Sequence, residues 1–77
     1  MREQVREIMA RVFEVPAGTV GDDAAFGDIV RWTSLTHTVL IAQIEHHFKI
    51  RVSNDEFQEM INFRNVCAVV HSHLSGR

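Results

Sequence analysis

Apolar residues recur along this chain with the spacing of one helix face, and the first stretch to carry the pattern is residues 3–14. Apolar positions there fall at i, i+3, i+4 and i+7, which predicts an amphipathic helix. Pro16 should end it, because the residue before a proline is disfavoured in the helical conformation. The stripe consists of Val5, Ile8, Met9 and Val12, and Phe13 and Val15 extend it.

The second stretch, residues 34–48, is apolar on two faces. Small hydroxyl residues precede it, which predicts an N-cap at Thr33 and places Ser34 in the first turn. One face should point inward, and it consists of His37, Leu40, Ile41, Ile44 and Phe48. The opposite face consists of Leu35, Val39, Ala42 and His46. Because full burial is difficult in so small a chain, we expect this second face to contact a partner.

After the second stretch, residues 49–52 predict an extended link rather than a paired strand. Ser53 and Glu56 then form the sequence signature of a capping box, in which the serine is followed three residues later by glutamate. This signature predicts the start of a short third helix across Phe57 and Met60.

A fourth helix should begin after Asn62, which is a good N-cap residue, and Gly76 should end it. Its inward stripe consists of Phe63, Val66, Cys67, Val70 and Leu74. With three longer helices and one short helix, the chain is predicted to be all-α and to form a small bundle.

The connection over residues 16–33 is long for a chain of this size, and loops of this length are commonly functional. Four of its apolar residues are spaced as anchors that would attach it to the core: Val20, Phe26, Ile29 and Val30. At its end, Trp32 is either another loop anchor or a partner contact, because indole serves both purposes.

Length and composition limit the class of protein. Seventy-seven residues predict one domain over residues 1–77, and 45% hydrophobic and 23% charged residues are ordinary for a soluble globular protein. No apolar run is long enough to span a membrane, the N-terminus lacks a signal-peptide pattern, and one cysteine suits a reducing compartment. We therefore expect a cytoplasmic protein. The net charge is −2 and the basic residues form no cluster, so we do not expect nucleic acid as a partner.

Ser34 is the strongest candidate for chemistry. Its hydroxyl would lie at the positive end of a helix dipole, among backbone N–H groups without intrahelical partners, and this position favours a phosphate ester. A Ser–His nucleophile with His37 is the competing interpretation, but so short a chain offers no scaffold for an orienting acid and an oxyanion hole. A metal site is not expected, because His46 and His47 are adjacent on one helix. Cys67 lies in an apolar stripe and should be buried.

With its helices and motifs in this order and spacing, the sequence resembles the acyl carrier proteins. The hallmark of that family is Asp-Ser-Leu at the start of its second helix, and Thr33-Ser34-Leu35 stands there in this chain. The resemblance covers nearly the whole chain, and further matching segments are Ala24-x-Phe26, Ile44-Glu45-His46-His47-Phe48 and Ile50-x-Val52. The string from Trp32 to His37 most resembles discrete carriers of specialised biosynthetic clusters.

The resemblance implies a non-catalytic carrier with an acyl-carrier-like four-helix fold. A phosphopantetheinyl transferase would move 4′-phosphopantetheine from coenzyme A onto Ser34, and the arm would hold acyl groups as thioesters. The other partners would be an acyl-loading ligase or acyltransferase and the synthases of fatty-acid-like, polyketide or other secondary metabolism. The carrier would be a monomer that binds no membrane. It would shelter the acyl group in a pocket between the second and third helices, lined by Phe26, His37, Ile44, Val52, Phe57 and Met60.

Two departures from the family pattern affect recognition. Thr33 replaces the family's aspartate and preserves its cap but not its charge, so we expect slower modification or a dedicated transferase. The acidic residues that usually crowd the second helix are reduced to Glu45, so docking should depend on apolar contacts and be less sensitive to salt. The predicted partner surface consists of Trp32, Thr33, Leu35, Thr36, Val39, Ala42, Glu45 and His46.

The alternative is a carrier fold that has lost its arm and acts as a protein–protein interaction module. Thr33 favours this alternative, whereas the retained Ser34 speaks against it. The contacts of such a module would be made by Trp32, Leu35 and Val39.

Overall fold

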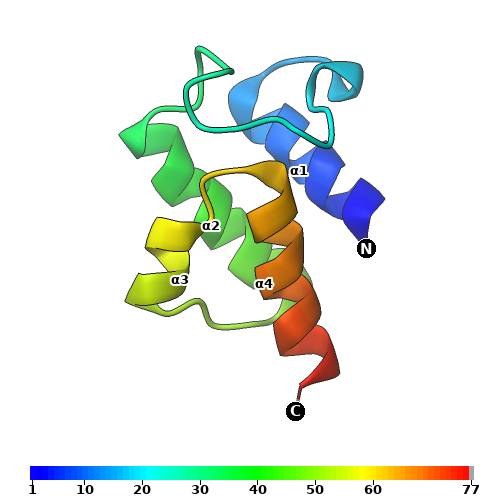
Figure 1. Cartoon of the computed structure of the whole chain (residues 1–77), viewed down its shortest axis with the longest axis vertical. Coiled ribbons are helices and arrows are strands. Elements are labelled where there is room, and N and C mark those ends of the chain that lie inside the picture. The colour runs from blue at the N-terminus through cyan, green and yellow to red at the C-terminus, as the bar shows by residue number, and fades with distance from the viewer. Residues whose placement is uncertain (77) are drawn as a thin grey trace.

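The computed structural model describes residues 1–76, and Figure 1 shows a bundle of helices joined by loops. The four α-helices are α1 (Arg2–Phe13), α2 (Ser34–Phe48), α3 (Asn54–Glu59) and α4 (Phe63–Ser75), and a 3₁₀ turn, η1 (Ala17–Thr19), lies in the long connection. The all-α, acyl-carrier-like four-helix bundle predicted from the sequence is therefore confirmed. The end of the predicted domain, at residue 77, lies outside the described residues.

Helix α1 ends one residue earlier than predicted, and proline is not what ends it. Glu14 adopts the left-handed conformation with φ 58°, and its N–H donates to the carbonyl oxygens of Ala10 and Arg11. A left-handed residue reverses the chain direction at the helix end, so Pro16 follows a helix that has already stopped.

The core lies where α1, α2 and α4 meet, and the inward faces predicted for these helices supply most of it. Leu74 is an exception, because 53% of it is exposed where the last turn of α4 extends beyond its neighbours (Figure 1). Val69 is buried on that helix instead. The largest fully buried side chains are Phe13, Phe63, Ile8, Met9, Leu40, Ile44, Met60, Val5, Val20, Val66 and Val70.

The connection between α1 and α2 is tied to the rest of the bundle by backbone hydrogen bonds. The N–H of Phe26 donates to the carbonyl oxygen of Ile61 (2.7 Å), and the N–H of Phe63 donates to that of Ala24 (2.8 Å). These bonds hold the loop against the link between α3 and α4, beside the start of α2 (Figure 1).

The anchors predicted in this loop are partly correct. Val20 and Ile29 are buried, and Phe26 is 47% exposed. Val30 is 92% exposed, so its predicted anchoring role is wrong. Ile29 occupies the core position, and Val30 lies at the surface in a turn that the hydrogen bond from the N–H of Trp32 to the carbonyl oxygen of Ile29 closes (2.9 Å).

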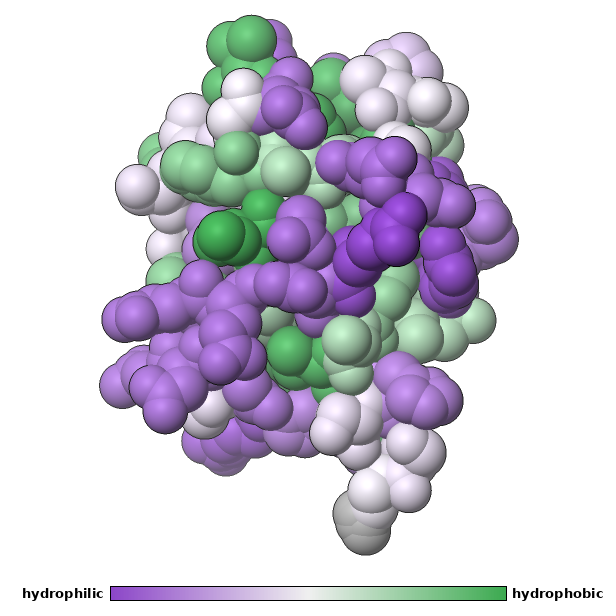
Figure 2. Space-filling model, viewed as in Figure 1, coloured by the Kyte–Doolittle hydropathy of each residue, from purple (hydrophilic) through white to green (hydrophobic). Residues whose placement is uncertain are grey.

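Most of the face seen in Figure 2 is hydrophilic, and hydrophobic residues gather toward the end of the molecule where the loop meets α2. Among residues 1–76, none of the helices combines the length and the apolarity that crossing a membrane requires.

Candidate functional site

Ser34 is the first residue of α2, and its side chain is exposed. Thr33 is the N-cap, as predicted, and its side-chain oxygen accepts a hydrogen bond from the N–H of Thr36 (3.3 Å). The Thr36 hydroxyl oxygen in turn accepts from the N–H of Thr33 (2.8 Å), and the hydroxyl donates to the carbonyl oxygen of Arg31. Two threonines thus form a reciprocal capping box that fixes the backbone on both sides of Ser34.

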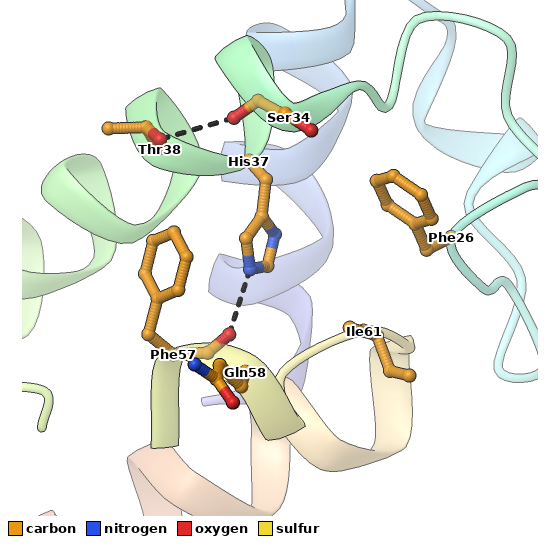
Figure 3. A pocket seen from close by; sticks show the side chains of 7 residues that line it. All are labelled: Phe26, Ser34, His37, Thr38, Phe57, Gln58 and Ile61. Carbon is orange, nitrogen blue, oxygen red and sulfur yellow. Dashed lines mark hydrogen bonds between the residues drawn. The ribbon is translucent and has the colours of Figure 1, made fainter. Parts of the chain in front are cut away.

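A mostly apolar cavity of about 320 Å³ opens beside Ser34, between α2, α3 and the long loop (Figure 3). It is lined by Phe26, Ser34, His37, Thr38, Phe57, Gln58 and Ile61. The serine therefore lies on the rim of a pocket that an attached group could enter.

Half of the predicted pocket residues line this cavity. Phe26, His37 and Phe57 do so, whereas Ile44, Val52 and Met60 do not. Ile44 and Met60 are fully buried, and Val52 is half-buried against the core. These three predictions are wrong because side chains pack closely deeper between α2 and α3. Ile44 and Met60 fill the space there and do not line it.

Three residues that line the cavity were not predicted from the sequence: Thr38, Gln58 and Ile61. Thr38 follows Ser34 by one helical turn, and this spacing could have identified it. Gln58 and Ile61 had no such signal, because their positions depend on how α3 and the following link pack against α2.

His37 is 6% exposed and forms hydrogen bonds through both ring nitrogens. Its Nδ1 accepts from the indole Nε1 of Trp32 (3.1 Å), and its Nε2 lies 2.9 Å from the carbonyl oxygen of Phe57. Because indole nitrogen only donates, Nε2 carries the proton of the neutral ring and donates to Phe57. In Figure 3 the imidazole points away from Ser34 toward α3. His37 is thus placed as part of the cavity wall and not as a base for Ser34.

Trp32 is an internal anchor of the loop. Its side chain is 2% exposed and stacks on Phe13 with ring centroids 5.0 Å apart. The sequence left open whether Trp32 is a loop anchor or a partner contact, and in the structure it is a loop anchor. A partner cannot contact this indole while it lies in the core, and this removes Trp32 from the predicted partner surface in the conformation described.

The outer face of α2 has the exposure that a docking surface needs. Leu35 and Val39 are 75% and 41% exposed, and Ala42 and His46 are also exposed. Partner binding by this face stays a prediction.

Glu45, the only acidic residue of α2, is used within the molecule. It is half-buried, and its carboxylate accepts a hydrogen bond from the N–H of Val52 (2.8 Å). The carboxylate therefore fixes the link after α2, and contact of Glu45 with a partner stays a prediction.

The remaining candidate residues lie apart from this site. Cys67 is buried as predicted, and burial raises the pKa of its thiol, which opposes formation of the reactive thiolate. His73 pairs with Glu56 across α4 and α3 (3.0 Å). Within residues 1–76, histidine, cysteine and carboxylate side chains form no cluster of three or more that could hold a metal ion.

The chain matches a known protein family over most of its length. The family model described as the phosphopantetheine attachment site matches residues 3–70. No curated protein matches the chain significantly. The matched range contains Ser34, its capping box and every residue that lines the cavity. Since the match covers most of the chain, the protein belongs to the phosphopantetheine-attachment family, whose prosthetic group is 4′-phosphopantetheine.

Proposed function

We propose that this protein is an acyl carrier that bears 4′-phosphopantetheine on Ser34. The observation that carries this proposal is the position of Ser34, which is exposed at the start of α2 and lies on the rim of an apolar cavity. The chain acts as a single carrier domain over residues 1–77 and catalyses no reaction itself.

The residues around Ser34 fit a phosphate ester. The first turn of a helix has backbone N–H groups without intrahelical partners, and its dipole favours negative charge. The first turn of α2 contains no acidic residue, so a phosphate there meets no carboxylate on that turn. The bound arm supplies a terminal thiol that holds an acyl group as a thioester.

Attachment uses Ser34 as the nucleophile. Its Oγ forms a bond to the phosphorus that bears the pantetheine part of coenzyme A, the pyrophosphate bond breaks, and adenosine bisphosphate leaves. The hydroxyl proton passes to a base on the transferase, because His37 is turned away with both ring nitrogens occupied. This chain contributes an accessible hydroxyl on a rigid helix end.

The partners follow from this role. A phosphopantetheinyl transferase attaches the arm, a ligase or acyltransferase loads it, and synthases use the acyl group. These enzymes dock on the outer face of α2, where Leu35 and Val39 are exposed. The string Trp32 to His37, which resembles carriers of specialised clusters, favours polyketide-like or other secondary metabolism in the cytoplasm, with the carrier as a monomer.

The test is the intact mass after incubation with coenzyme A, Mg²⁺ and a broad-specificity phosphopantetheinyl transferase. The parent protein should gain the mass of one phosphopantetheine, and Ser34→Ala should abolish the gain. Ser72→Ala is the matched control, because Ser72 is an exposed helical serine on α4 and its loss should change nothing. A gain that persists in Ser34→Ala would contradict the proposal.

Thr33 keeps the interaction module as a second candidate function, because the cap it forms lacks the carboxylate of the family pattern. Thr33→Asp distinguishes the two. Modification only in Thr33→Asp would mean that threonine impairs recognition by the transferase. If neither protein is modified, the interaction module becomes the better account.

A further inference from the structure

Among the residues that line the cavity beside Ser34, only His37 is buried, and we propose that this histidine forms the inner wall and limits the length of the acyl group that the carrier shelters. The inference rests on the proposed function, and it adds the substrate class: short acyl groups. In this role His37 selects the length of the acyl chain and takes no part in a reaction.

His37 is held in place from two sides. Trp32 in the loop donates to its Nδ1, and its Nε2 donates to the carbonyl oxygen of Phe57 on α3. The ring also packs edge-on against Phe57, with centroids 4.6 Å apart. Rotating the ring out would leave the buried Trp32 N–H without its acceptor and would break the bond to α3, so the ring is a rigid part of the wall.

The space beyond His37 is already filled. Leu40, Ile41 and Ile44 follow His37 on the same face of α2, one and two turns further along. Leu40 and Ile44 are fully buried, Ile41 is 5% exposed, and none of the three lines the cavity. A chain that outgrows the cavity therefore meets the imidazole and has to remain in solvent.

The size of the cavity sets the expected limit. Its volume of about 320 Å³ is near the lower end of the range of roughly 300–1,000 Å³ that is usual for ligand pockets. A cavity of about 150 Å³ is enough for the six carbons of benzene, so by volume alone roughly twelve carbons would fit. Because the cavity is open on one side, only roughly six to eight of them should be buried. The walls are aromatic or apolar at Phe26, Phe57 and Ile61, which suits a hydrocarbon chain.

The experiment uses a series of acyl groups on the whole protein. A broad-specificity transferase attaches acetyl-, butyryl-, hexanoyl-, octanoyl- and decanoyl-phosphopantetheine from the corresponding coenzyme A thioesters, and the intact mass verifies each product. Each methylene that becomes buried should raise the Tm by up to about 3–6 °C. In the parent protein the Tm should rise with chain length and level off at roughly hexanoyl to octanoyl.

Three variants assign the limit to the imidazole. His37→Ala vacates the volume of the imidazole, so the plateau in Tm should move to longer acyl chains, toward decanoyl. His37→Gln can make both hydrogen bonds and should keep the plateau. His46→Ala is the matched control, since His46 is an exposed histidine on the same helix and its loss should leave the series unchanged. A Tm that rises through decanoyl in the parent, or a plateau at the same chain length in His37→Ala and the parent, would overturn the proposal.

A second measurement needs no variant and decides the question if His37→Ala does not fold. Methyl NMR of the parent should show that decanoyl loading shifts the signals of Ile61 and leaves those of Leu40 and Ile44 in place. Shifts at Leu40 and Ile44 would mean that the chain passes His37 and would overturn the inference. Failure of the proposed function is distinguishable, because it appears earlier, as the absence of any mass gain.

Discussion

The indole N–H of Trp32 donates a hydrogen bond to Nδ1 of His37 across 3.1 Å in the interior of the bundle. The same imidazole donates from Nε2 to the carbonyl oxygen of Phe57. One side chain of α2 is therefore bonded both to the loop before Ser34 and to α3. The position of Ser34 relative to the cavity depends on these two bonds, because they join the elements that form the rim and the wall.

Replacing the indole tests how much this bond stabilises the fold. Trp32→Phe keeps an aromatic ring that can stack on Phe13 but leaves Nδ1 of His37 without a donor. The free energy of unfolding should fall by about 1–3 kcal/mol. Urea titration followed by circular dichroism measures it, because the variant lacks the sole tryptophan. Val30→Ala, at a position 92% exposed in the same loop, should stay within about 0.5 kcal/mol of the parent. Equal stability of Trp32→Phe and the parent would contradict the prediction.

The threonine capping box should matter for both stability and loading. Thr36→Val removes the acceptor for the N–H of Thr33 and the donor to Arg31, so it should cost about 1 kcal/mol, whereas Thr36→Ser should keep most of this contribution. Because the first turn frays, Thr36→Val should also lower the kcat/KM of Ser34 modification. Urea titration and transferase kinetics measure the two effects. Wild-type stability in Thr36→Val would mean that the box contributes little.

Helix starts could be predicted from the sequence because capping is a local interaction. Thr33, Ser53 and Asn62 each accept a hydrogen bond from an N–H three residues later, and all three were identified from residue type and spacing. The inward face of α2 was also predictable, since periodicity alone selects the residues that face the core.

The interior of the cavity was not predictable, because it depends on distances between helices. Whether Ile44 and Met60 line a space or fill it is decided by how closely α2 and α3 approach, and periodicity does not contain that distance. The hydrogen bond that the carboxylate of Glu45 accepts was not predictable for a similar reason. Its donor, the N–H of Val52, lies in a link whose path the sequence pattern does not define.

The stability of the bundle at acidic pH should depend on Glu56. The N–H of Ser53 donates to its carboxylate (2.9 Å), and His73 lies at 3.0 Å, so the pKa of Glu56 is lowered from its ordinary value of 4.5. Folding thus favours the ionised carboxylate, and the stability it contributes is complete above pH 4.5 and is lost as the pH falls through the lowered pKa.

Glu56→Gln should therefore flatten the fall in the free energy of unfolding between roughly pH 5 and pH 3. Urea titrations at several pH values measure the slope. Glu59→Gln, at an exposed position on the same helix, is the matched control and should follow the parent curve. If the slope of Glu56→Gln equals that of the parent, the bonds to Ser53 and His73 do not contribute to acid stability.

Salt should have little effect on modification of Ser34. Glu45 is the only acidic residue of α2 and it is half-buried, so a basic transferase meets little negative charge along this helix and long-range attraction is weak. Between about 50 and 300 mM salt, the kcat/KM of the transferase should change less than roughly twofold. Ala42→Glu adds a carboxylate to this exposed face and should introduce a salt dependence. A strong dependence in the parent protein would indicate attraction through charges elsewhere.

Leu35 should be the main apolar contact of that docking face. It is 75% exposed beside Ser34, so Leu35→Ala should change the free energy of unfolding by less than about 0.5 kcal/mol. Truncation of a central apolar contact costs an interface about 1–2 kcal/mol, so the kcat/KM of the transferase should fall roughly tenfold. Leu74→Ala is the matched control, because Leu74 is an exposed leucine (53%) near the end of α4 and should keep parent kinetics. Equal losses in the two variants would show that the transferase does not select this face.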